Sequence, residues 1–198
     1  MTNKLKANQD LIVISVIFGE ALTILTRLKE TIFRISPGTW QCKEGAFCFN
    51  DCFIGYPPPG GAHKVKLLAF TSRPDSYALF TANLEDGWVS LAYILSESLK
   101  TKALTLGFCS DNVTYPARFF NVLNDGKLIR HVSVRLDNKW QYYEKGAILP
   151  KENASNYTKR LIKARLTNEN LIDLADKFGI SLGNLAELSG KGILLAQT

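Results

Sequence analysis

The sequence is poor in the residues that bind metals or carry out covalent chemistry. It has 4 cysteines and 2 histidines among 198 residues, and none of the cysteines form a Cys-x-x-Cys pair. A zinc site with the usual ligand spacing is therefore not expected. Without a secretory signal, the cysteines are interpreted as reduced, partly buried thiols. They are Cys42, Cys48, Cys52 and Cys109.

The chain also lacks a long apolar run. The stretch Leu11–Phe18 is followed at once by Gly19 and Glu20, whereas a membrane helix needs about 18 or more residues. Asp10 interrupts the basic N-terminus, and no small-residue cleavage site follows the apolar stretch, so we expect no secretory signal. With 46% hydrophobic and 21% charged residues, the composition is typical of a folded globular protein rather than a disordered one. We expect a cytoplasmic protein that does not enter the membrane.

Two strings imitate catalytic motifs but lack their context. Gly179–Gly183 has the spacing of a nucleophile elbow, yet that motif needs a strand before Ser181 and a histidine after it, and here a helix is predicted before it and no histidine follows. Gly190 and Lys191 lack the other residues of a phosphate-binding loop. His131 and the other histidine, His63, are interpreted as surface histidines. We therefore predict no catalytic residue, no cofactor site, no metal site and no enzymatic activity.

The periodicity of the apolar residues predicts strands first, mixed with two helices, and then a helical end. Strands are expected at 11–18, 46–54, 65–70, 77–81, 103–109, 117–123, 128–136 and 140–144. Helices are expected at 20–34, 86–99, 157–166, 168–178 and 182–188. The turn 124–127, Asn-Asp-Gly-Lys, favours a hairpin and makes residues 117–144 a three-stranded antiparallel meander.

This order of elements predicts an α+β fold. We expect a largely antiparallel sheet that includes the meander, with helices packed on one side and a helical C-terminal tail. The proline- and glycine-rich segment 55–63 is the only plausible domain boundary, but the residues before it would form a poor independent core. Residues 1–198 are therefore expected to form a single domain.

The positive charge lies mainly in the last third of the chain. Residues 127–198 hold 12 of the 24 basic and 7 of the 18 acidic side chains, so they carry +5 of the net +6. Lys159, Arg160 and Lys163 fall within one turn of the expected helix 157–166. Such a cluster could contact phosphates or an acidic protein surface, although a solvated helix face is the commoner explanation.

Three aromatic residues precede this basic cluster. Strand alternation places Trp140 and Tyr142 on one face and Tyr143 on the other. Tryptophan, tyrosine and arginine are the residue types that anchor protein interfaces. The predicted partner-binding residues are Trp140, Tyr143, Lys159, Arg160 and Lys163.

Residues 81–180 resemble immunity proteins that protect bacteria from polymorphic or contact-delivered toxins. The resemblance rests on the order of five pieces: Asp86-Gly87-Trp88, the turn 124–127 with Arg130 beyond it, Asp137 to Trp140, Gly146 to Glu152, and the helix from Leu166 to Phe178 with Gly179-Ile180. It implies a small cytoplasmic inhibitor that binds a cognate toxin domain and blocks its active site or its folding. The net positive charge of this chain departs from the acidic character that is usual for inhibitors of nuclease toxins. It favours a toxin with an acidic or neutral surface.

Two other classes remain open at this point. A nucleic-acid-associated protein could use the basic C-terminal helix, and its affinity would fall steeply with salt. An enzyme could have a site dispersed through the sequence, which would require a deep pocket with convergent polar groups.

Overall fold

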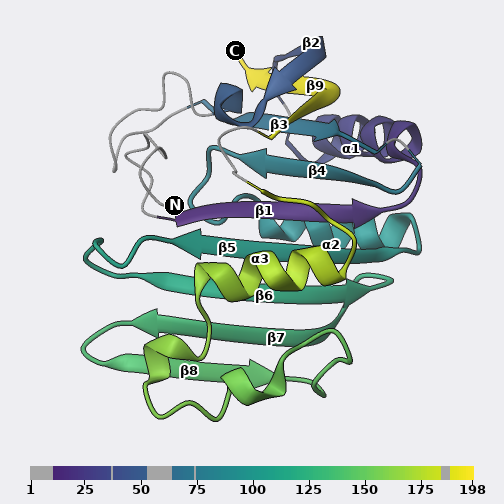
Figure 1. Ribbon diagram of the computed structural model, residues 1–198. Helices are drawn as coiled ribbons and strands as arrows, with labels where there is room; N and C mark the ends of the chain where they lie inside the picture. The colour runs from purple at the N-terminus through teal and green to yellow at the C-terminus, as the bar shows by residue number, and fades with distance from the viewer. Residues whose placement is uncertain (1–10, 37, 53–63, 74, 184–187) are drawn as a thin grey trace.

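The described residues form an antiparallel sheet of nine strands that runs from the top to the bottom of the view in Figure 1. The computed structural model describes residues 11–36, 38–52, 64–73, 75–183 and 188–198. The strand order is β2-β9-β3-β4-β1-β5-β6-β7-β8, and every neighbouring pair is antiparallel. The strands are β1 (Leu11–Phe18), β2 (Trp40–Cys48), β3 (Lys66–Thr71), β4 (Tyr77–Ala82), β5 (Lys102–Cys109), β6 (Ala117–Asn124), β7 (Lys127–Leu136), β8 (Trp140–Lys145) and β9 (Ser189–Gln197).

Helices cover both faces of this sheet. They are α1 (Ala21–Ile35), α2 (Val89–Ser98) and α3 (Asn168–Lys177), with short 3-10 helices η1 (Phe49–Cys52), η2 (Ala154–Asn156) and η3 (Ile162–Ala164). Leu28 of α1 and Leu95 of α2 belong to the core on one face, whereas Leu171 of α3 belongs to the core on the other. In Figure 1, α3 lies in front of the sheet and α1 and α2 lie behind it. The expected α+β class with an antiparallel sheet is confirmed, but the expectation that helices pack on one side is wrong, because the central strands are apolar on both faces and both need cover.

Several local predictions are confirmed. β1 is buried along most of its length, α1 begins one residue later than expected, and residues 117–144 form the meander β6-β7-β8. Thr167 caps α3, and Asn170 completes a reciprocal capping box. Gly179, with a φ of +83°, follows the end of this helix as expected.

The predicted helix 157–166 is wrong. This segment contains only η3 and irregular turns. The Thr158 hydroxyl donates to the carbonyl of Ser155, and the Arg165 Nε donates to the carbonyl of Lys159. Such side-chain bonds to the backbone compete with helical hydrogen bonding.

The expected C-terminal helix is present as α3, but the chain continues beyond it into strand β9, which lies between β2 and β3. Gly192 allows this pairing: a Cβ there would lie 2.0 Å from the carbonyl oxygen of Ala69. β2 covers residues 40–48 rather than 46–54, and η1 follows it. Segment 55–63, residues 53–54 of the expected strand and 184–187 of the expected helix 182–188 lie outside the described residues.

Candidate binding surface

One face of the sheet continues beyond the helix that covers it. α2 packs on β1, β5 and β6, and β7 and β8 lie farther out, toward the lower end of the view in Figure 1. Alternate residues of β6, β7 and β8 point to this side, opposite the core residues Phe120, Val132 and Val134. We call this surface the open face; its side chains are Phe119, Asn121, His131, Ser133, Arg135, Gln141 and Tyr143.

A row of polar side chains runs from beneath α2 onto the open face at one register. Ser15 and Thr105 are hydrogen-bonded beneath α2, with their hydroxyl oxygens 3.1 Å apart. Thr105 pairs with Asn121, and Asn121 with His131. The His131 Nδ1 lies 2.6 Å from the Asn121 Oδ1, and its Nε2 lies 3.1 Å from the Ser133 Oγ. Both nitrogens of the imidazole are therefore engaged, and the ring orientation is fixed.

Burial, and then the nearby charge of Arg130, lower the pKa of His131. This shift favours the neutral form of the ring. Because an amide oxygen only accepts, Nδ1 carries the proton and Nε2 accepts from the Ser133 hydroxyl.

The order of Asn121, His131 and Ser133 is similar to the Asp-His-Ser triad of serine hydrolases, but an amide stands in the place of the carboxylate. Acyl transfer additionally needs N–H donors aimed at the developing oxyanion. β7 pairs with β6 on one side and β8 on the other. The backbone N–H groups beside Ser133 therefore take part in hydrogen bonds between strands. The row is thus a set of polar side chains held in fixed positions on the sheet.

Tyr143 is the most prominent side chain of the open face. Its side of β8 bears a shallow hollow, and Tyr143 is 57% exposed there. Its ring centroid lies 5.5 Å from that of His131. Across the next register pair, the Arg135 Nε donates to the Gln141 Oε1 over 3.1 Å. An exposed aromatic ring thus stands beside an ordered guanidinium.

The opposite side of β8 is covered by the segment that follows it. Trp140 and Tyr142 pack against the core there, and the Arg165 guanidinium lies 5.2 Å from the centre of the Tyr142 ring. η3 packs on β8. We call residues 153–168 the covering segment; they include no aspartate or glutamate, so all the charged side chains of this segment are basic.

A buried charge cluster attaches the covering segment to β7. The Arg130 Nε donates to both carboxylate oxygens of Glu152, at 3.0 and 3.1 Å, and its NH1 donates to the carbonyl of Gly146. Glu152 also accepts from the Leu149 N–H and the Tyr157 hydroxyl. Burial and this bond to Glu152 both raise the pKa of Tyr157, which keeps its hydroxyl a donor.

The structure divides the five sequence-predicted residues between two sides of β8. Tyr143 is on the open face, as alternation predicted, and Trp140 is half-buried on the other side. Lys159, Arg160 and Lys163 are exposed on the covering segment. Sequence reasoning missed Arg135, Gln141 and the pairing of His131 with Asn121. The 124–127 turn indicates the hairpin but not this pairing, because an irregularity between Val122 and Leu123 shifts the register by one residue.

The described residues show no metal centre and no spanning helix. Among them, no three His, Cys, Asp or Glu side chains are grouped as metal ligands. Within this part of the chain Cys42, Cys48 and Cys52 form no disulfide bond, and burial raises the pKa of the Cys52 thiol to about 12. Within the described ranges no helix is both long and apolar enough to cross a membrane.

The fold and surface together define an α+β protein with an exposed, ordered aromatic and basic sheet face. Comparison of the chain with protein-family models, with curated proteins and with solved structures found no match.

Proposed function

We propose that this protein is a non-catalytic inhibitor that binds a bacterial toxin domain, and that the open face is part of the contact surface. The observation that carries the proposal is Tyr143, an aromatic side chain that is 57% exposed on an otherwise well-ordered sheet. Tyrosine and arginine are enriched among the residues that dominate binding energies. Arg135, within the same hollow, supplies the second of these types.

The rigidity of the surface supports a binding role. The Asn121–His131–Ser133 row and the Arg135–Gln141 bond hold the side chains in place before any partner arrives. Preorganised side chains lose less conformational freedom on binding, so more of the contact energy appears as affinity.

The toxin is proposed from the resemblance of residues 81–180 to immunity proteins. The pieces that carry the resemblance fall in the loop before α2, the β6–β7 turn, the β7–β8 turn, the segment 146–152, and α3. Two of them, containing Arg130 and Glu152, meet in the buried charge cluster. An inhibitor of this kind would act in the cytoplasm, and the net charge of +6 favours a partner with an acidic or neutral surface.

The test is direct binding to the product of a neighbouring reading frame that encodes a toxin domain. The two proteins should copurify, and the inhibitor should abolish the toxin's activity. Replacing Tyr143 with alanine should weaken binding about 30-fold, or about 2 kcal/mol, as expected for an interface anchor.

Leu22→Ala is the control, because Leu22 is 71% exposed on α1, which is not part of the open face. It should leave the affinity unchanged. No complex at micromolar concentration, or a neighbour without toxic activity, contradicts the proposed function.

One observation keeps nucleic-acid binding as the alternative. The basic cluster Lys159, Arg160 and Lys163 is exposed on an irregular segment, and the open face adds the aromatic rings of Phe119 and Tyr143. Proteins that bind single-stranded nucleic acid contact the phosphates with basic side chains and stack the bases on aromatic rings. Affinity for an oligonucleotide that falls steeply with salt would support this alternative.

A further inference from the structure

β8 ends the described sheet on one side, and both of its faces present groups suited to binding. Tyr143 and Arg135 lie on the open face. The covering segment, which packs on the other face through η3, presents Lys159, Arg160 and Lys163. A partner that surrounded this edge would contact both sets at once.

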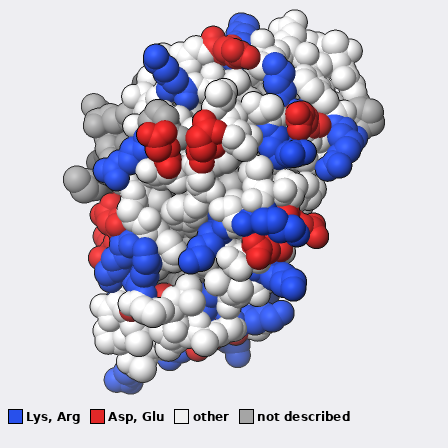
Figure 2. Space-filling model, turned by 90° about the vertical axis from the view of Figure 1, so that its right-hand side faces the viewer, with Lys and Arg blue, Asp and Glu red and all other residues white. Residues whose placement is uncertain are grey.

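The charge around this edge is predominantly positive. Arg135, Lys139 and Lys145 are exposed on the strands and their turn, in addition to the cations of the covering segment. Two acidic side chains lie here: Asp137, which is exposed in the same turn, and Glu144, which accepts from the Arg130 NH2 at 2.7 Å and is thereby compensated. In Figure 2, Lys and Arg predominate over Asp and Glu at the lower end, which is the end where Figure 1 shows β8.

An apolar side chain stands within the basic segment. Leu161 is 63% exposed and directly follows Arg160. Loops and side chains are costly to order on binding, but this segment is already attached to β7 through Arg130, Glu152 and Tyr157. It therefore presents Leu161 and its neighbouring cations from a fixed support.

We propose that the β8 edge and the covering segment enter an acidic cleft of the partner protein as a wedge, with the partner contacting both faces. The β8 end is defined by Arg135, Lys139, residues 140–145 and residues 159–163. This inference rests on the proposed function and specifies its partner: a protein cleft with acidic walls and an apolar pocket for Leu161. Positive charge on both faces speeds association with such a cleft, and Tyr143 and Leu161 slow dissociation.

The test measures the affinity of the full-length protein for the neighbouring-frame product with one variant on each face. Tyr143→Ala changes the open face, and the double variant Arg160→Glu with Lys163→Glu changes the covering segment. Each should weaken binding about tenfold or more near 50 mM NaCl, and the charge reversal should act mainly on the association rate. Raising NaCl toward about 500 mM should reduce the difference in affinity between the charge-reversal variant and the unaltered protein, because salt screens the charges.

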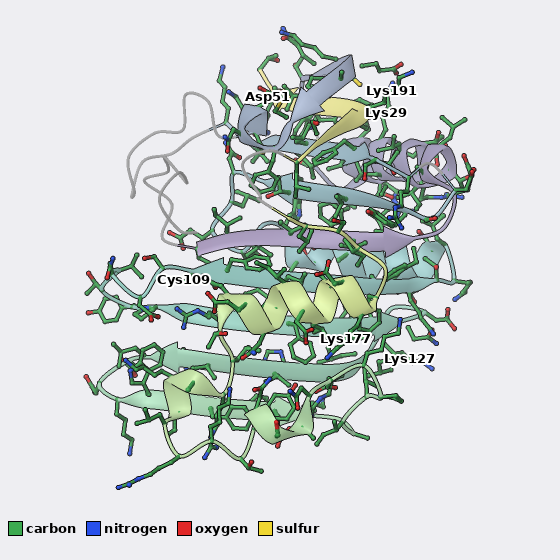
Figure 3. All side chains as sticks on the ribbon, in the orientation of Figure 1. Lys29, Asp51, Cys109, Lys127, Lys177 and Lys191 are labelled. Carbon is green, nitrogen blue, oxygen red and sulfur yellow. The ribbon has the colours of Figure 1, made fainter. Side chains whose placement is uncertain are left out.

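The matched control reverses two exposed cations at the other end of the sheet, Lys43→Glu with Lys191→Glu. Lys191 lies on β9, far from β8 in Figure 3. This control should bind within about twofold of the unaltered protein, because its charges lie beyond the screening length from the proposed contact.

The outcomes separate the wedge from the proposed function. If Tyr143→Ala weakens binding but the Arg160 and Lys163 reversal does not, the proposed function stands and the wedge is overturned. If the unaltered protein does not bind, the proposed function fails. If a single-stranded oligonucleotide binds and the same reversal abolishes that binding, the segment recognises phosphates and the acidic protein cleft is overturned.

Discussion

Arg130 and Glu152 form an ion pair in which both side chains are completely withdrawn from solvent. The pair joins β7 to the segment that covers β8, and it places the Arg130 guanidinium 5.4 Å from the centre of the Tyr157 ring. Sequence separation between the two residues is 22, so the pair closes a long loop onto the sheet. The position of the basic segment depends on this contact.

Removing the acid from this pair should be strongly destabilising. Glu152→Ala leaves the buried Arg130 without its main partner, and we expect the free energy of unfolding to fall by about 3–5 kcal/mol. Urea denaturation measures the change. Glu30→Ala, which breaks the exposed Arg27–Glu30 pair, should cost less than about 1 kcal/mol. Equal effects of the two substitutions would show that the buried pair does not anchor the segment.

Two glycines with similar backbone angles should tolerate alanine differently. Gly146 and Gly179 have φ values of +87° and +83°. A Cβ at Gly146 would lie 2.0 Å from the carbonyl oxygen of Ile129, whereas one at Gly179 meets nothing within 4 Å. Gly179→Ala should cost about 1 kcal/mol from the backbone angle alone, and Gly146→Ala about 3 kcal/mol because the neighbouring carbonyl must also move. Thermal unfolding that shows equal costs would contradict the packing of Gly146 against β7.

Stability should depend on the titration of His131. Its pKa is lowered from the ordinary value of 6.5 by burial and then by the charge of Arg130. Between the two values the unfolded chain binds more protons than the folded one, so stability should fall as the pH drops below about 6.5 toward the lowered pKa. NMR titration should place the His131 midpoint below 6.5, and His131→Gln should flatten the stability profile between about pH 7.5 and 5.5. A midpoint at or above the ordinary value would contradict the burial of the row.

The cysteines should differ in reactivity toward a thiol reagent. Cys48 is exposed, whereas Cys52 is buried and its pKa is raised to about 12 by that burial. Thiolate is the reactive form, so the native protein should be labelled at Cys48 while Cys52 reacts only after denaturation. Mass spectrometry of the labelled peptides identifies the sites. Labelling of Cys52 at the rate of Cys48 would show that the core around η1 opens readily.

The elements predictable from sequence are those decided by nearby residues. The β-branched run of β1, the Thr167 cap of α3 and the Asn-Asp-Gly-Lys turn at 124–127 each specify local geometry. β9 could not be predicted in this way. Its glycines are needed because a Cβ there would clash with the backbone of β3, which lies more than a hundred residues earlier in the chain. Segment 157–166 looked helical, and its actual course is set by distant partners such as Arg130 and Tyr142.

In the candidate surface, too, some features follow from nearby residues and others from distant contacts. Alternation along β8 was enough to separate Tyr143 from Trp140. The placement of Lys159 and Arg160 on the far side of β8 depends on how the covering segment is anchored, which no local pattern encodes. The hydrogen bond between Asn121 and His131 depends on the register of the β6–β7 hairpin, including the irregularity after Val122.

Hydrogen–deuterium exchange of the protein, alone and bound to the neighbouring-frame product, tests the central claim most directly. Binding at the β8 end should slow exchange in peptides that cover residues 140–145 and 159–163, and should leave α1 and β2 unchanged. Slower exchange confined to α1 or β2, with no change at the β8 end, would contradict the account.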